Sequence, residues 1–382
     1  MANTMIFCII TQVPHLTTAD GRIWSYAPYV REMNMWLQHA DTVILVAPQL
    51  QDATPDALHL PYEHHHMDWV IVPALAWHRA PIAVRSTLNL PMVGLRILQS
   101  MRKSAHIHLR CPGNMGLLGV LLQRFFPHTP KTVKYAGNWV SNDRQPWSYR
   151  LQKKLFRSPF WMVNARVLAY TFNPDEPQHI TSSFGPSYSQ HQRSLAVPQR
   201  STNRMYLLFV GSLHHGKQPN QLLQLTAQLR HSGMDAHCYV AGQGPLEAAL
   251  ISQAESLQAT DAEHWIHFLG GLDAEQLQSY YQRCHFMVLP SQSEGWPKAV
   301  AEAMWWGCVP VVPPISCVSD MLDGGQRGVI MTDLSTTTDA LVALWKNPEQ
   351  YHHMAQSAQQ WSQAFTIERF AEGVAAFMQA PH

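Results

Sequence analysis

Charged residues are scarce in this 382-residue sequence, and long apolar runs are absent. Charged side chains make up 14% of the chain and hydrophobic ones 46%, a balance that excludes an intrinsically disordered protein. No stretch approaches the roughly 20 consecutive apolar residues that a transmembrane helix needs. The opening segment, MANTMIFCII, lacks the basic region and cleavage site of a secretion signal, so we expect a cytoplasmic protein.

Paired cysteines and metal-binding motifs are also missing. The six cysteines show no CxxC spacing and mostly lie in apolar surroundings, so we expect reduced thiols in the protein core. The chain has no Asp-x-Asp motif. Three histidines follow Glu63 at positions 64–66, but consecutive side chains point in different directions, and an exposed loop is the favoured interpretation. We therefore expect a metal-independent protein.

The small net charge of +1 conceals an uneven distribution. Residues 1–195 contain 18 Lys and Arg against 10 Asp and Glu, whereas the remaining residues contain 9 against 16. The overall balance gives no sign of nucleic-acid binding. The basic first half predicts contact with something anionic, either a phosphate-bearing substrate or an acidic membrane surface.

Short apolar runs alternate with helical patterns along the first half of the chain. This alternation is typical of βαβ units and predicts an open parallel sheet with an α/β fold. The expected strands cover residues 5–10, 42–47, 69–72, 105–109, 132–135 and 167–171. A polar stretch rich in Ser, Gln and Pro lies between residues 181 and 203, and it predicts a boundary between two domains.

The stretch SEGWPKAVAEAMWWG, residues 293–307, places Glu294 in a loop and Glu302 on a helix. Residues 286–289 are expected to form a buried strand before this loop, and residues 298–306 a helix after it. A loop at the carboxyl edge of a parallel strand is where doubly wound sheets bind phosphates and sugars. The two carboxylates would hold different parts of one extended ligand. Alternatively, one stabilises the helix start and the other is simply solvated.

This stretch, with the following CVPVV, resembles the donor-site motif of the retaining glycosyltransferases of family 4. Segments 207–229, 240–250 and 267–291 resemble the same family in the same order. The resemblance implies a GT-B fold, in which two Rossmann-like domains face each other across a cleft. The implied parts are an acceptor domain (1–190), a linker (191–204), a donor domain (205–362) and a C-terminal segment crossing back to the first domain (363–382).

The resemblance also implies roles for residues in the second half. Glu294 would bind sugar hydroxyls, Glu302 the ribose, and Lys217 the leaving diphosphate. The implied donor-binding set comprises Gly211, Ser212, Lys217, Leu269, Ser291, Glu294, Gly295, Trp296 and Glu302. Two positions depart from the family pattern: Ser212 stands where an arginine is usual, and Pro297 removes an amide donor.

The acceptor side offers weaker signals at Gly21, Arg110 and Asn138. Gly21 follows Asp20 where many family members have paired glycines, and Asn138 lies near the usual place of a histidine. Arg110 precedes a Gly-containing turn that either contacts substrate or serves packing. Residues 147–161 form a basic amphipathic pattern that would suit an anionic membrane and a lipid-linked acceptor, although packing on the first domain is favoured.

The sequence therefore predicts a retaining glycosyltransferase without cofactor. It would move sugar from a UDP-, GDP- or ADP-sugar to a glycan or lipid-linked acceptor in bacterial surface polysaccharide synthesis, in the cytoplasm or at the inner face of the membrane. The alternative is a non-catalytic nucleotide-sugar or glycan-binding relative, motivated by Ser212 and Asn138. A GT-B epimerase or phosphorylase is a third interpretation, which the family 4 segments disfavour.

Overall fold

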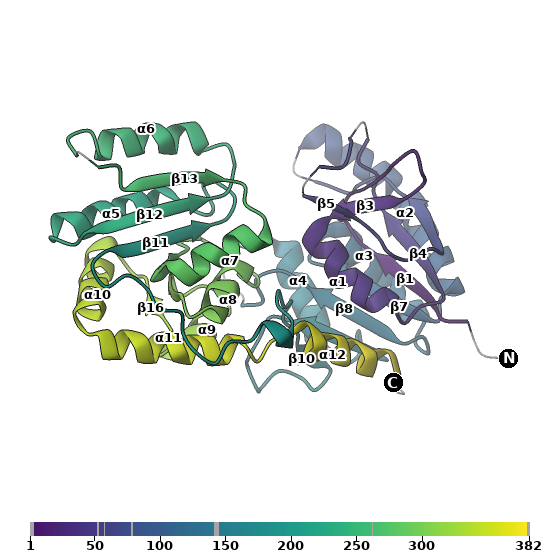
Figure 1. The fold of residues 1–382 in the computed structure, drawn as a ribbon. Coiled ribbons are helices and arrows are strands. Elements are labelled where there is room, and N and C mark those ends of the chain that lie inside the picture. The colour runs from purple at the N-terminus through teal and green to yellow at the C-terminus, as the bar shows by residue number, and fades with distance from the viewer. Residues whose placement is uncertain are drawn as a thin grey trace. The chain divides into compact units, whose positions relative to one another are not determined.

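Two parallel sheets, each with helices on both faces, organise the chain (Figure 1). The computed structural model describes residues 4–51, 53–56, 58–77, 79–140, 145–261 and 263–379. The first unit runs to Phe184 and resumes at Arg369, and the second unit comprises Gly185–Glu368. The α/β class expected from the sequence is confirmed.

The first unit contains a seven-stranded parallel sheet in the order β10-β9-β8-β7-β1-β4-β6. All six apolar runs expected as strands belong to it, with ends that differ by a few residues. Its strands are β1 (Ile6–Ile10), β4 (Thr42–Ala47), β6 (Met67–Ile71), β7 (His106–Cys111), β8 (Lys131–Tyr135), β9 (Ala165–Ala169) and β10 (Ile180–Ser182). A small antiparallel sheet follows β1 and consists of β2 (His15–Thr17), β3 (Ile23–Tyr26) and β5 (His59–Pro61).

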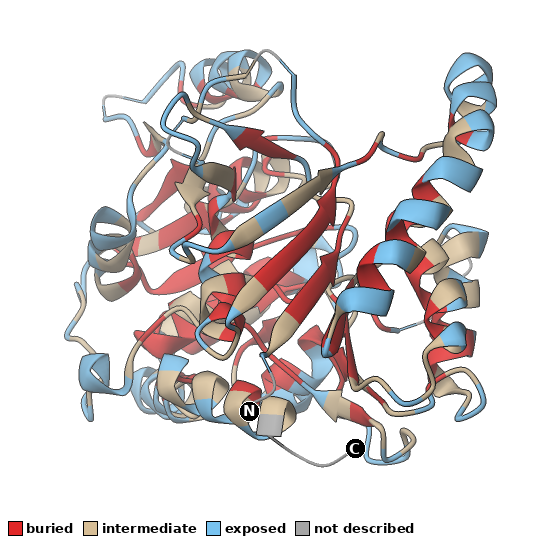
Figure 2. Cartoon of the chain, turned by 90° about the vertical axis from the view of Figure 1, so that its right-hand side faces the viewer, coloured by how far each residue is buried: buried red, intermediate tan, exposed pale blue. Residues whose placement is uncertain are grey.

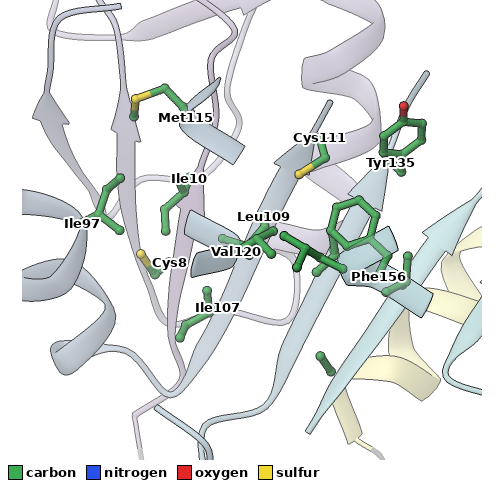
Figure 3. Close-up of a cluster of buried hydrophobic side chains, with 14 of the residues drawn as sticks. Cys8, Ile10, Ile97, Ile107, Leu109, Cys111, Met115, Val120, Tyr135 and Phe156 are labelled. Atoms are coloured by element: carbon green, nitrogen blue, oxygen red, sulfur yellow. The ribbon is translucent and has the colours of Figure 1, made fainter. Parts of the chain in front are cut away.

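Helices cover both faces of this sheet, which explains why β1 and β4 are almost entirely apolar. Alternate residues of β1 serve opposite faces: Phe7 and Ile9 belong to one core cluster, and Cys8 and Ile10 to the other. Figure 3 shows part of the cluster that contains Cys8 and Ile10, and Figure 2 shows the buried strands in red. The helices of this unit are α1 (Ala27–Leu37), α2 (Ala80–Lys103), α3 (Asn114–Leu122), α4 (Trp147–Arg157) and most of α12 (Ile367–Gln379), with the 3-10 turn η1 (Gln123–Phe125).

The second unit contains a six-stranded parallel sheet in the order β13-β12-β11-β14-β15-β16. Its strands are β11 (Met205–Val210), β12 (Ala236–Ala241), β13 (Ile266–Gly270), β14 (Phe286–Val288), β15 (Val309–Val312) and β16 (Val329–Ile330). Its helices are α5 (Asn220–His231), α6 (Glu247–Leu257), α7 (Ala274–Arg283), α8 (Lys298–Trp305), α9 (Val318–Leu322), α10 (Leu334–Lys346) and α11 (Pro348–Ser362), with the 3-10 turns η2 (Gln190–Gln192) and η3 (Asp323–Gly325).

The expected linker, residues 191–204, is part of the second unit. Arg200 anchors it by donating hydrogen bonds to the carbonyl oxygens of Cys284 at 2.7 Å and Trp306 at 2.8 Å. The boundary lies between Phe184 and Gly185, inside the polar stretch 181–203 and before the linker range 191–204. A polar composition alone does not distinguish a linker from a segment that is held by one well-placed arginine.

Helix α4 packs into the core of the first unit instead of offering an apolar stripe to solvent. Leu155 and Phe156 are buried in the larger core cluster, and Lys153 is also buried. Arg157 forms an ion pair with Glu176 at 2.6 Å. Of the two interpretations of residues 147–161, packing on the first unit is therefore the one that the structure supports, and an apolar membrane face on this helix is not.

All six cysteines are buried free thiols, as expected. Burial raises the pKa of Cys8 and of Cys308 to about 12, so these thiols stay protonated and unreactive. Within the described ranges, no helix combines the length and apolar character needed to cross a bilayer.

Candidate active site

The strand order of the second unit marks one point at its sheet edge where a ligand site is expected. From β11, the chain moves outward through β12 and β13, then returns to the other side of β11 for β14, β15 and β16. Where the strand order reverses in this way, doubly wound sheets usually bind a ligand in a crevice beyond the carboxyl ends of the strands, which here are the ends of β11 and β14 with their following loops. Lys217 lies in the first of these loops and Glu294 in the second.

Backbone hydrogen bonds join the four loops at this edge into one layer. Gly242 N donates to Gly270 O at 2.7 Å, Leu213 N to Gln243 O at 2.9 Å, and Gln292 N to Gly216 O at 2.9 Å. Close approach of two loops requires glycine at position 242, because a Cβ there would lie 1.9 Å from the carbonyl oxygen of Gly211. The layer holds the candidate side chains on a fixed backbone.

Lys217 and Glu294 meet at this crevice. The Lys217 ammonium donates a hydrogen bond to Glu294 Oε1, and the two side chains are 24% and 10% exposed. The pair joins loops that are far apart in the sequence, and its partial exposure leaves both charges within reach of a ligand. A cation beside a carboxylate can bind a diphosphate with the first group and sugar hydroxyls with the second. Ser212 lies exposed in the same loop as Lys217.

The remaining donor-side residues fall into different environments. Ser291 is buried in the loop after β14, and its hydroxyl has no hydrogen-bond partner among the described residues. Leu269 is half-buried near the end of β13. The carbonyl oxygen of Gly295 accepts a hydrogen bond from Ser316 at 3.3 Å. The indole of Trp296 is buried and donates to Gly185 O at 3.2 Å.

Glu302 is held by two hydroxyl groups. Ser187 Oγ donates to its Oε1 at 2.6 Å, and the phenol of Tyr281 donates to its Oε2 at 3.0 Å. Tyr281 is fully buried, and burial raises its pKa well above the usual value, so the phenol keeps its proton and remains a donor. The carboxylate is thus fixed in one orientation. The sequence analysis missed both partners, because each is distant along the chain and carries no motif.

The first unit has a corresponding switch point between β1 and β7, but protein groups fill it. The side-chain oxygen of Gln12, just after β1, accepts hydrogen bonds from the amides of Asn114 at 2.7 Å and Met115 at 3.2 Å. These amides belong to the first turn of α3, so a neutral side chain caps this helix start.

The acceptor-side candidates do not converge on one constellation. Gly21 lies in the turn between β2 and β3 with a positive φ of 79°. Arg110, in β7, forms a largely buried ion pair with Glu32 of α1 at 2.9 Å. Burial lowers the pKa of Arg110, but the attraction to Glu32 outweighs this effect and holds the pKa above its usual value. Asn138, after β8, has a buried side-chain oxygen without a hydrogen-bond partner among the described residues.

A search of the described residues finds no group of three or more His, Cys, Asp or Glu side chains placed to hold a metal ion. The histidine run does not gather such a group. His64 Nε2 lies 3.0 Å from the backbone oxygen of Ala40, and the neighbouring His65 and His66 are exposed.

Residues 191–361, a little under half of the chain, match the family described as Glycosyl transferases group 1. The matched residues all lie in the second unit. Among curated proteins, the chain is 25% identical over 253 residues to D-rhamnosyltransferase WbpZ of Pseudomonas aeruginosa, covering 64% of this chain and 58% of that protein. It is 24% identical over 245 residues to glycogen synthase of Mycobacterium tuberculosis, covering 61% and 56%. The chain thus spans a little over half the length of these relatives.

The solved structure of Anabaena Alr3699/HepE in complex with UDP and glucose matches 99% of this chain and 100% of its own chain. Its TM-score is 0.67 and its sequence identity 13%. At this identity the similarity shows the fold alone, and it confirms the GT-B class expected from the sequence.

Proposed function

We propose that this protein is a glycosyltransferase that binds a nucleotide diphosphate sugar in the second unit. The observation that carries the proposal is the meeting of Lys217 and Glu294 at the switch point of the donor-type sheet. The group 1 family match covers the same unit, and both curated relatives are named as sugar-transferring enzymes. The geometric and family arguments therefore both support the second unit as the donor-binding part.

The chemistry assigned to each residue follows from charge and position. As the glycosidic bond to the leaving diphosphate breaks, negative charge grows on the phosphate oxygens, and Lys217 neutralises it. The amides in the first turn of α8 add positive electrostatic potential at the same edge. Glu294 accepts hydrogen bonds from sugar hydroxyls, which requires donor to replace part of its contact with Lys217. Glu302, oriented by Tyr281 and Ser187, accepts hydrogen bonds from the ribose.

The resemblance to family 4 extends the proposal to the stereochemistry and the acceptor. We assign attack on the same face of the sugar, with retention of configuration and no metal or other cofactor. The acceptor is a glycan or a lipid-linked sugar of a bacterial surface polysaccharide. WbpZ is named for D-rhamnosyl transfer, while the second relative synthesises glycogen by its name, so the donor sugar stays open among UDP-, GDP- and ADP-sugars. The buried free thiols are compatible with a reducing, cytoplasmic setting.

Release of nucleotide diphosphate from each donor, with and without mixed glycan acceptors, tests the proposal. We expect one donor to turn over. Lys217→Ala should slow release by a factor of roughly 100 to 1,000, the usual loss when one group that stabilises transition-state charge is removed. Glu294→Gln should give a loss of similar size. The matched controls are Lys346→Ala and Glu255→Ala, which change exposed charges on α10 and α6; equal losses in the controls would contradict the assignment.

A non-catalytic binding relative is the second candidate, and Ser212 is the observation that favours it. A hydroxyl carries neither the charge nor the two-pronged geometry of the expected arginine, so phosphate stabilisation during bond cleavage is weaker. Such a protein would be stabilised against thermal unfolding by a nucleotide sugar but would release no nucleotide. Detecting epimerised free nucleotide sugar without acceptor would instead support the GT-B epimerase interpretation.

A further inference from the structure

Helix α2 exposes an apolar stripe along its outer face. Val84, Leu88, Met92 and Leu95 follow each other at spacings of four, four and three residues, so they share one side of the helix. Leu88 is 75% exposed. The opposite side, which includes Val93 and Ile97, is fully buried on the sheet. At the right of Figure 2, α2 shows much of this outer face in pale blue.

The exposed apolar surface continues beyond the stripe. Trp77 is 45% exposed and attaches to the helix through a hydrogen bond from its indole to Thr87 Oγ1 at 3.2 Å. Ile82, near the helix start, is exposed as well. Monomeric soluble proteins rarely expose a contiguous apolar strip of this kind without a binding role. For comparison, α11 in the second unit presents Glu349, His352 and His353 to solvent.

The sequence segment that contains the stripe carries charge of one sign only. Residues 69–142 contain nine Lys and Arg and not a single Asp or Glu. Five of these cations are exposed on or beside α2: Arg79, Arg85, Arg96, Arg102 and Lys103. Long basic side chains flanking an apolar helix face can reach anionic headgroups while the apolar residues enter the acyl boundary.

We propose that the α2 surface, comprising Trp77, Ile82, Val84, Leu88, Met92 and Leu95 with the flanking cations, docks the first unit on an anionic lipid bilayer. A second copy of the chain is a poorer occupant. An isologous contact through α2 would bring the exposed cations of both copies together, and residues 69–142 offer no carboxylate to pair with them. Helix α4 exposes Trp147 but buries Leu155 and Phe156 in the core, so it presents no comparable apolar stripe. The inference is independent of the proposed transferase chemistry.

Flotation of the full chain with vesicles tests the proposal directly. Vesicles of phosphatidylcholine alone should bind weakly, and vesicles that also contain phosphatidylglycerol should bind strongly, with a loss of binding at high salt. Leu88→Asp should weaken binding roughly tenfold or more, and Leu88→Asp with Leu95→Asp roughly 100-fold, because each leucine is withdrawn from the acyl boundary. The matched control is Leu195→Asp, which alters a 99% exposed leucine of the second unit and should bind like the unmodified chain.

A second pair of variants tests the charge component. Arg85→Gln with Lys103→Gln should reduce binding to phosphatidylglycerol vesicles, whereas Lys346→Gln, at the end of α10, should not. Circular dichroism and melting temperature should be unchanged in all variants, since the altered side chains are exposed. No binding to anionic vesicles, or equal binding by the leucine variants, would overturn the proposal. So would a dimer in buffer, seen by analytical ultracentrifugation, that Leu88→Asp dissociates.

Discussion

The two units share a doubly wound topology but use their switch points in opposite ways. In the second unit, the loops after β11 and β14 bring Lys217 and Glu294 together, and both side chains are partly exposed. In the first unit, Gln12 occupies the equivalent place and hydrogen-bonds the starting amides of α3. The same edge of the sheet thus carries a charged pair in one unit. In the other unit, a neutral side chain already accepts the hydrogen bonds of the helix amides.

This difference shows that topology locates a possible site, while the side chains decide whether a ligand can use it. A helix start whose amides already have an acceptor has less to offer a phosphate. The donor proposal therefore rests on the second unit, and a ligand of the first unit must be bound by other groups. The following predictions challenge this comparison, from the largest expected effect to the smallest.

Acidification should weaken the first unit strongly. Burial lowers the pKa of His15 and of His108 to about 3, so both stay neutral in the folded chain but take up protons when it unfolds. The unfolded state then binds more protons, and stability falls as pH drops below about 6.5, by roughly 2 kcal/mol per histidine at pH 5. In the second unit, burial lowers the pKa of His285 to about 4, so this histidine also makes stability fall at low pH. Hydrogen exchange at pH 6.5 and 5 measures the loss in β1 and β7, and unchanged exchange free energies there would contradict it.

Gly242→Ala should damage the second unit far more than Gly21→Ala damages the first. The new methyl group at position 242 would collide with the backbone of Gly211, which cannot yield without moving the loop layer, and the cost is roughly 3 kcal/mol. At position 21 the space is open and only the positive φ is unfavourable, for about 1 kcal/mol. Urea unfolding compares the two variants. Equal destabilisation would mean that the loop layer is not rigid.

Ser212→Arg should strengthen donor binding at the site of Lys217 and Glu294. The guanidinium would add a charge-assisted contact to the donor phosphates, and we expect donor binding to tighten about tenfold. Isothermal titration with the donor identified by turnover measures the change. His215→Arg, an exposed position in the same loop, is the control for a general gain of positive charge. The same gain in both variants would point to nonspecific attraction instead of a phosphate contact at position 212.

Gln12→Ala should weaken the first unit modestly. The amides of Asn114 and Met115 would lose their acceptor, a change comparable to removal of a helix cap, at about 1 kcal/mol. Urea unfolding gives the stability, and Gln51→Ala, at an exposed position after β4, serves as the control. Nucleotide-sugar affinity should not change in either variant. A large loss of that affinity in Gln12→Ala would indicate that the first unit binds the donor, which contradicts the proposal.

Sequence patterns predicted what is local and repetitive. The apolar run 42–47 is β4 residue for residue, because a short apolar run is a pattern of near neighbours. The small sheet of β2, β3 and β5 was not anticipated, since its strands are only three or four residues long. Contacts between distant residues, such as Ser187 with Glu302, also escaped prediction.

Hydrogen exchange with and without UDP, GDP and ADP, read peptide by peptide, tests most directly whether the second unit holds the donor. The account predicts that one nucleotide gives its strongest protection in the loops containing Lys217 and Glu294, at residues 211–217 and 290–298. Lys217→Ala should abolish this protection. Strongest protection around Gln12 and residues 112–115 of the first unit, or protection in the second unit that survives Lys217→Ala, would contradict it.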